Sequence, residues 1–322
     1  MTRTRVLRTA AASLEHTFVV GETPTDSTTT VTVSATNAAG SVVASGNATT
    51  AGAGTGRYTF ALAGQPLLSV LQVAWSATIA GADVVETDQV EIAGGFLFTL
   101  KEGRDSDATL ADTVKYPTAR LAKARLETEE ECEEICDRAW VPRYRRAVLD
   151  GTGHSDLLLP DLDVRNVRSA TMAPRYGQAA VALTAGQLAA LTTTNDGSLR
   201  RTDGASWTAG NDNIVVEYEY GADSPPAELV TAALIRFRAR LNLFRSGVPD
   251  RATSWSSAEG GTYRIELPSE WRTGIPEVDA VYSRYSRRAR STTAGADGGS
   301  FPASRTLDYD PQYRSLFHGG RR

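Results

Sequence analysis

Six glutamates and two cysteines within one short segment are the residues of this chain whose types and spacing could do chemistry. The segment "YPTARLAKARLETEEECEEICDRAW" spans residues 116–140, and all six glutamates lie between Glu127 and Glu134. Cysteine thiolates bind zinc, and paired carboxylates act as general acids and bases. Three interpretations are therefore open: a metal site, an acidic catalytic cluster, or one face of a helix that has another purpose.

A metal site is disfavoured because further ligands are missing from the sequence. Cys132 and Cys136 are the two cysteines, and the three histidines stand far apart at positions 16, 154 and 318. Zinc held by thiolates needs additional cysteine or histidine ligands. A disulfide is also disfavoured, because neighbours on one helix have poor bridging geometry. We expect two reduced, buried thiols and neither a metal nor a cofactor.

The best catalytic candidate is the segment "GTGHSD", which places His154 beside Ser155 and Asp156. Adjacent residues on a turn do not converge on one substrate atom, and a catalytic triad is defined by its geometry. The sequence also contains no phosphate-binding glycine loop, dinucleotide fingerprint or nuclease-type set of carboxylates. We therefore expect His154 to be exposed on a turn, no catalytic residues, and no enzyme activity.

The acidic segment itself predicts an amphipathic helix that begins at Pro117. Its glutamates mostly fall off the apolar stripe, so the outer face of the helix is very acidic. Glutamates near the C-terminal end of a helix oppose its dipole, so helical propensity does not explain them. The apolar stripe consists of Leu121, Ala124, Thr128, Cys132, Ile135, Cys136 and Ala139.

The strand pattern before this helix predicts an all-β domain over residues 16–95. Segments such as "TTTVTVSAT" and "VLQVAWSATIAG" alternate β-branched or aromatic residues with polar ones between glycine-rich turns. Regular short strands of this kind favour an immunoglobulin-like β-sandwich with Trp75 as a core residue. Residues 1–15 are interpreted as a basic N-terminal arm, and residues 96–115 as a linker.

Residues 116–290 form the second predicted domain, in which β hairpins are inserted between helices. A second helix is expected over residues 222–247 and a short third one over residues 277–290. A glycine- and serine-rich stretch then leads into an extended, flexible C-terminal arm, residues 291–322. The predicted fold class is therefore α+β with two domains.

Composition excludes several broad classes of protein. The chain has 322 residues and a net charge of -4, which predicts neither a nucleic-acid binder nor a polyanion. Both ends are basic, with three arginines in the first fourteen residues and eight between residues 281 and 322. No apolar run reaches the roughly 18 residues that a membrane span needs. No signal peptide is predicted, and the reduced thiols are consistent with a cytosolic site of synthesis.

The order of segments across residues 110–290 resembles the head-to-tail connector (adaptor) proteins of long-tailed double-stranded DNA bacteriophages, in the version found in actinobacteriophages. The resemblance rests on "YPTARLAKARLETEEECEEICDRAWVPR", "LDGTGHSDLLLPDLDVRNVRSATM", "NIVVEYEYGADSPPAELVTAALIRFRARL" and "TGIPEVDAVYSRY". Many adaptors begin near the equivalent of residue 110, so the N-terminal β-sandwich is an addition. The resemblance implies a helical domain with inserted hairpins and no catalysis.

The resemblance also implies a place in the virion neck. It implies a dodecameric ring beneath the portal protein that extends the DNA channel and carries tail-side stopper or terminator proteins. Genomic DNA would pass through the ring without specific binding. The resemblance assigns no role to the N-terminal domain, which is expected either to reach the major capsid protein or to decorate the neck. Glutamates in a lumen repel DNA phosphates, whereas arginines would add affinity.

These implications assign candidate roles to three groups of residues. Glu127, Glu130, Glu131 and Glu134 are candidates for lining the channel or for contacts within the ring. Arg236 and Arg240 are candidates for meeting those glutamates across a subunit interface. The candidate portal-docking arm contains Phe301, Arg305, Tyr309, Tyr313, Arg314 and Phe317.

Two other functions stay open at this level. A tail, baseplate or capsid-decoration protein would use the sandwich to bind carbohydrate or the capsid surface. A cytosolic DNA-binding regulator would need a basic reading helix, whereas the first predicted helix is acidic.

Overall fold

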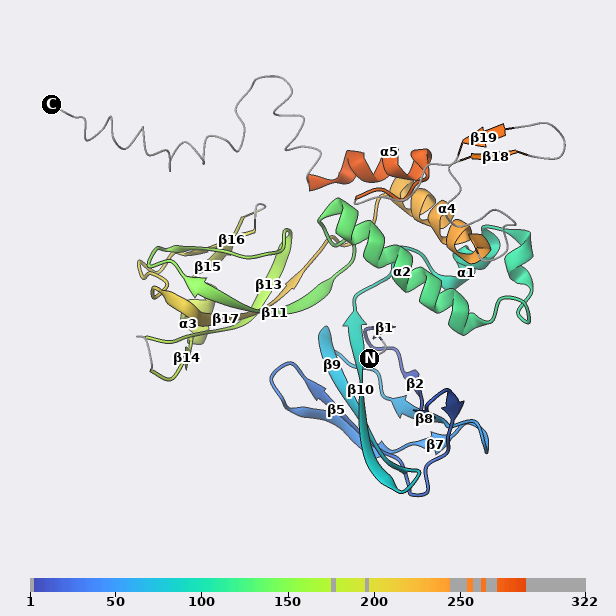
Figure 1. The fold of residues 1–322 in the computed structure, drawn as a ribbon. Coiled ribbons are helices and arrows are strands. Elements are labelled where there is room, and N and C mark those ends of the chain that lie inside the picture. Colours follow the sequence, from blue (N-terminus) through green and yellow to red (C-terminus); the bar gives the residue numbers. More distant parts are fainter. Residues whose placement is uncertain are drawn as a thin grey trace. The chain divides into compact units, whose positions relative to one another are not determined.

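The protein was analysed as a computed structural model (Figure 1), which describes residues 3–174, 178–194, 197–243, 254–256, 262–264 and 271–287. The fold is mixed α and β. Two compact units divide the chain: one holds Met1–Thr99 and Ala139–Pro225, and the other holds Leu100–Arg138 and the described residues of Pro226–Arg322. The predicted connector region, residues 116–290, is therefore not one contiguous unit, because its inserted β segment groups with the N-terminal strands.

The N-terminal strands of the first unit form two sheets and a small hairpin. A five-stranded sheet has the order β1-β10-β9-β5-β6, a three-stranded sheet has the order β2-β8-β7, and β3 pairs with β4. The strands are β1 (Arg3–Leu7), β2 (Ala12–Thr17), β3 (Val19–Val20), β4 (Thr23–Pro24), β5 (Thr32–Asn37), β6 (Val42–Asn47), β7 (Thr49–Thr50), β8 (Arg57–Leu62), β9 (Ser69–Ile79) and β10 (Ala82–Ala93).

The two sheets enclose one hydrophobic core. Trp75 on β9 is 1% exposed, as expected, and it packs in this core with Leu14 of β2 and Phe60 of β8. Residues alternate in and out along β2, β8 and β9, which is why the β-branched pattern could be recognised in the sequence. An immunoglobulin-like connection of these strands stays a prediction.

The expected basic arm over residues 1–15 is wrong from Arg3 onward. β1 pairs in parallel with Gln89–Ala93 of β10, and β2 pairs antiparallel with β8. The prediction failed because the arginines of β1 are typical of a solvated segment. In the structure, Arg5 is buried against an acidic partner on β10.

The inserted segment of the first unit forms a second β layer with its own core. Two sheets, of order β11-β17-β13-β14 and β12-β16-β15, surround buried Trp207, Val216 and Leu199. The elements are β11 (Arg143–Gly151), β12 (Asp156–Leu158), β13 (Val164–Met172), β14 (Val181–Ala182), α3 (Ala185–Ala189), β15 (Leu191–Thr193), β16 (Ser198–Arg201) and β17 (Gly210–Tyr220).

Two glycines of this layer occupy positions that a larger residue would not fit. Gly221 has a φ of +100°, and a Cβ there would lie 2.3 Å from the carbonyl oxygen of Val141. At Gly151, a Cβ would lie 1.7 Å from the carbonyl oxygen of Thr208. Glycine is required at both positions because it has no Cβ.

The second unit is mainly helical. Its elements are α1 (Leu100–Asp105), the 3₁₀-helix η1 (Ala108–Ala111), α2 (Thr118–Cys136), α4 (Ala227–Leu243), β18 (Ser254–Ser256), β19 (Thr262–Arg264) and α5 (Pro276–Tyr285). α2, α4 and α5 contact one another pairwise (Figure 1). The predicted linker over residues 96–115 thus contains helices α1 and η1, and its Leu110 is buried.

The apolar stripes of the three main helices form the core of this unit. All residues of the stripe predicted on α2 are buried, from Leu121 to Ile135 and Cys136. α4 contributes Leu229 and Phe237, and α5 contributes Tyr282. Helices with one apolar face must bury it against other elements, and here each helix buries its face against the other two.

Candidate functional site

The predicted glutamates of α2 and arginines of α4 meet within one chain. The guanidinium of Arg236 donates two hydrogen bonds to Glu131, from Nε to Oε2 at 2.7 Å and from Nη2 to Oε1 at 2.8 Å. The two side chains are 14% and 20% exposed. A fork-shaped pair of this kind is among the stronger side-chain contacts when it is partly buried.

Arg240 extends this pair by one helical turn. Its Nη2 lies 3.0 Å from Oε2 of Glu131, and its Nη1 donates to Oε2 of Glu127 at 3.3 Å. Burial alone would raise the pKa of Glu131, but the hydrogen bond and charge of Arg236 outweigh it and lower the pKa. The carboxylate partners of Arg236 and Arg240 in the structure thus lie in the same chain, and a contact of these arginines with a neighbouring subunit stays a prediction.

The remaining glutamates of α2 differ in their surroundings. Glu134 is exposed, Glu130 and Glu133 are half-buried, and Glu129 is buried. The acidic face is therefore not uniformly solvated, since α4 covers the side that carries Glu131. Of the four predicted channel glutamates, Glu134 is the one that stands open to solvent.

The two cysteines lie in the core of the helical unit, as predicted. Both are free thiols and both are 0% exposed. Burial raises the pKa of the Cys132 thiol, and the neighbouring Cys136 raises it further. Among the residues that the structure describes, no group of three or more His, Cys, Asp or Glu side chains could hold a metal ion.

The other candidate residues are either exposed or outside the described part of the chain. His154 is exposed, and its backbone N–H donates a hydrogen bond to Oγ1 of Thr152 in the turn after β11. The arm that contains Phe301, Arg305, Tyr309, Tyr313, Arg314 and Phe317 lies outside the described residues. Within the described ranges, no helix is both long enough and apolar enough to cross a membrane.

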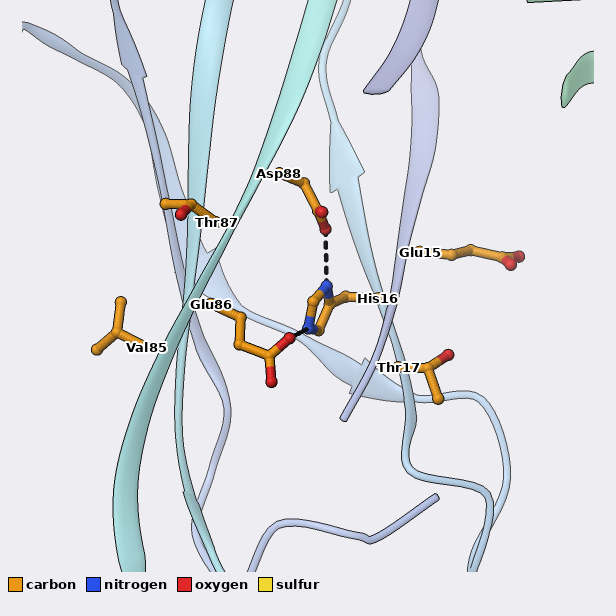
Figure 2. A pocket seen from close by; sticks show the side chains of 7 residues that line it. All are labelled: Glu15, His16, Thr17, Val85, Glu86, Thr87 and Asp88. Carbon is orange, nitrogen blue, oxygen red and sulfur yellow. Dashed lines mark hydrogen bonds and ion pairs between the residues drawn. The ribbon is translucent and has the colours of Figure 1, made fainter. Parts of the chain in front are cut away.

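A polar cluster around His16 was not recognised in the sequence. Figure 2 shows the imidazole of His16, on β2, between two carboxylates of β10. Nδ1 lies 2.7 Å from Oδ2 of Asp88, and Nε2 lies 3.1 Å from Oε2 of Glu86 without hydrogen-bond geometry. The ring also stacks on Trp75 at 5.2 Å between centroids and is itself only 9% exposed.

The His16 cluster opens into a polar groove of about 520 Å³ (Figure 2). Residues 15–17 of β2 and residues 85–88 of β10 line it. The sequence does carry a signal for it, because Glu86 and Asp88 lie between Val84 and Val90 on the core-facing side of β10. Charged residues at inward-facing positions break the period-two pattern of a half-buried strand.

Glu91 forms a second buried charge cluster in the first unit. Its Oε1 accepts from Nη1 of Arg143 at 2.5 Å, and its Oε2 accepts from Nε of Arg5 at 3.1 Å and Nη2 of Arg3 at 3.2 Å. Burial alone would raise the pKa of Glu91, but the charges of Arg143 and Arg5 outweigh it and lower the pKa to about 2. The cluster joins β1, β10 and β11.

A comparison with models of protein families finds no match. A comparison with curated proteins also finds none.

Several chains of solved structures are similar to part of this one, among them three from GTA particles. A chain titled as the neck of an empty GTA particle, computed with C6 symmetry, is 16% identical, covers 59% of this chain and 89% of its own, and has a TM-score of 0.38. A second chain, from the virion of a native gene transfer agent (GTA) particle, is 15% identical. Its alignment covers 59% of this chain and 89% of its own, with a TM-score of 0.39. A third chain, from the neck of a native GTA particle computed with C12 symmetry, is 13% identical. Its alignment covers 60% of this chain and 93% of its own, with a TM-score of 0.37. At these identities and TM-scores, the likenesses carry no argument about what this chain does.

Proposed function

We propose that the chain is a structural protein of a bacteriophage neck, a head-to-tail adaptor that forms a ring beneath the portal protein. The observation that carries this proposal is the assembly of α2, α4 and α5 into one helical unit, with the β layer of residues 139–225 inserted between α2 and α4. A helical domain with inserted β hairpins is the architecture that the sequence resemblance implies.

The motifs behind the resemblance occupy positions that build this architecture. In "YEYGADSPP", the hydroxyl of Tyr218 donates to Oδ2 of Asp161 at 2.6 Å, and Gly221 makes the tight approach to Val141. In "PEVDAVYSRY", Val278 is buried, and Asp279 accepts from the backbone nitrogen and Oγ1 of Thr273 at 2.7 Å. The motifs therefore support the proposal through shared architecture, and none of them forms a reactive site.

In this proposal the glutamates of α2 have two different roles. Glu127 and Glu131 join α2 to α4 within the subunit, where Arg236 and Arg240 neutralise them. Glu134, with Glu130 beside it one turn earlier, remains as the candidate lining of the DNA channel or as a contact in the ring. Carboxylates that line a channel repel DNA phosphates and let the genome slide.

The proposed partners follow from the same resemblance. The ring would be a dodecamer that carries tail-side stopper or terminator proteins. The resemblance assigns no role to the N-terminal strands, and we propose that they approach the major capsid protein. The arm of residues 291–322 would embrace the portal protein or a neighbouring copy. The protein would be made in the host cytoplasm and act in the virion neck, where DNA passes through it without specific binding.

Reconstitution with the portal protein tests this proposal. The purified chain, mixed with portal rings and viewed by electron microscopy, is expected to add a ring of density on one face of the portal. A variant that lacks residues 301–322 is expected to lose this binding while its circular dichroism spectrum stays unchanged. Free chains beside bare portals would reject the adaptor function, and full binding by the truncated variant would reject the docking role of the arm.

A charge reversal tests the lining role separately. Glu134→Lys is expected to leave ring assembly intact and to give the ring salt-sensitive affinity for DNA, because each added cation releases counterions from the phosphates. Glu22→Lys, which makes the same change in charge at an exposed position between β3 and β4, is the matched control and should add no DNA affinity. Assembled rings of the Glu134→Lys variant that bind no more DNA than wild type would reject the lining role.

A further inference from the structure

The five-stranded sheet of the first unit ends in β1 on one side and in β6 on the other. Among the residues that the structure describes, β5 is the one strand that pairs with β6. The residues of β6 are exposed, apart from the half-buried Ala44. A strand at the edge of a sheet presents backbone N–H and C=O groups that can pair with another chain. The outer edge of β6 is therefore open to strand pairing.

β6 lies in a segment that has no charged side chain. Residues 27–56 contain no Asp, Glu, Lys, Arg or His, although 22% of the whole chain is Asp, Glu, Lys or Arg. β6 also has no proline, and its one bulge, at Val43, leaves the register with β5 regular from Ala44 to Asn47. Charged side chains, prolines and bulges are the devices that keep edge strands from pairing. The regular part of β6 carries none of them.

The other edges of the described sheets are either short or charged. The edge strands β7, β12, β14 and β15, and both strands of the hairpins β3–β4 and β18–β19, have two or three residues each. β1, β2 and β11 are longer, and they carry exposed charges such as Arg3, Glu15 and Arg145. Among these edges, β6 alone combines more than three residues with no charge.

An uncharged edge favours an uncharged partner strand. A charged side chain that is buried against it would find no opposite charge there, which costs free energy. A second copy of the chain supplies the same uncharged strand. Two β6 strands related by a twofold axis form a self-complementary contact in which no like charges meet.

We propose that β6 pairs antiparallel with β6 of a second copy of this chain, with Ser45 opposite Ser45 of the second copy. Ala44 packs against the core, a Cβ at Gly46 would meet the inward-facing Phe60, and Ser45 between them is exposed. This register therefore keeps the outer faces of both sheets on the same side. Each copy offers one such edge, so the contact by itself joins two copies and no more. It is a property of the N-terminal strands and does not depend on the neck function.

Sedimentation of the purified full chain, without portal protein, tests the pairing. The wild type is expected to associate reversibly as its concentration rises. Ser45→Lys is expected to weaken this association about fivefold or more, because two cations would lie directly opposite each other. Ser13→Lys, the same substitution at an exposed position of β2 in the other sheet, is the matched control and should associate as the wild type does. A wild type that does not associate, or equal weakening in both variants, would overturn the proposal.

A charge swap separates repulsion across the contact from a loss of folding. Ser45→Lys and Ser45→Glu are each expected to associate weakly with themselves. An equal mixture of the two should associate at least fivefold more tightly than either variant alone, because lysine then lies opposite glutamate. A mixture that associates no better than its components would overturn the pairing of Ser45 with Ser45 of the second copy.

Hydrogen exchange on the wild-type chain locates the contact and needs no variant. Strand pairing engages backbone N–H groups, so a higher protein concentration is expected to slow exchange in β6 and to leave β1, the opposite edge of the same sheet, unchanged. This readout is local, so it also identifies the contact within a larger assembly of copies. Association without added protection of β6 would overturn the proposal.

Discussion

Removing the charge of Glu91 is expected to destabilise the first unit, and acid should do so over a defined pH range. The pKa of Glu91 is lowered from 4.5 to about 2 because the charges of Arg143 and Arg5 outweigh its burial. A carboxyl group whose pKa is lower in the folded state contributes stability that is fully present above the unfolded pKa and is lost as the pH falls. The contribution should therefore decline from about pH 4.5 toward pH 2.

The size of this effect follows from the shift in pKa. One pKa unit corresponds to about 1.4 kcal/mol, so the full contribution of Glu91 is roughly 3 kcal/mol. Proton linkage then predicts a loss of roughly 2 kcal/mol between about pH 6 and about pH 3. The side chain of Glu91 is only 5% exposed, so screening by solvent removes little of it.

Urea unfolding of the wild type and of Glu91→Gln at a series of pH values measures this contribution. Near neutral pH the variant should be less stable by roughly 3 kcal/mol, because its three arginines lose a buried partner. The difference in free energy of unfolding should shrink by roughly 2 kcal/mol toward pH 3, where the wild-type carboxyl also takes up a proton. Glu22→Gln, at an exposed position, should show no such trend. A difference that stays constant with pH would refute the reasoning.

Three further outcomes are expected. In a double-mutant cycle of Arg236→Ala and Glu131→Gln, unfolding should give a coupling of about 1 kcal/mol or more, and additive effects would contradict the pair seen between α2 and α4. A thiol reagent should react with neither cysteine in the native chain and with both after unfolding, because burial raises the pKa of Cys132 and blocks access. Gly221→Ala should lower the free energy of unfolding by about 2 to 4 kcal/mol, whereas Gly204→Ala, with positive φ but no neighbour within 4 Å, should cost about 1 kcal/mol. Equal costs at the two glycines would show that the approach to Val141 carries no penalty.

Local patterns predicted the elements and their buried faces well. The period of the apolar residues on α2 predicted the buried positions of its stripe, including both cysteines, but not the buried Arg125 and Glu129. The alternation in the N-terminal strands predicted Trp75 as a core residue. These features depend on the geometry of a single helix or strand, which recurs along the sequence with a fixed period. The start of the domain was missed for the same reason, because the arginines of β1 give a polar pattern although Arg5 is buried.

The sequence by itself determined the main helices, most of the strands and the apolar face of the acidic helix α2. It missed strand β1, helices α1 and η1 in the predicted linker, and the short helix α3. Only the tertiary structure decided which charges meet. Arg236 and Glu131 stand 105 positions apart, and His16 and Asp88 stand 72 apart. The sequence left open whether α2's glutamates meet arginines of the same chain or of a neighbour, because an ion pair depends on how two elements pack together.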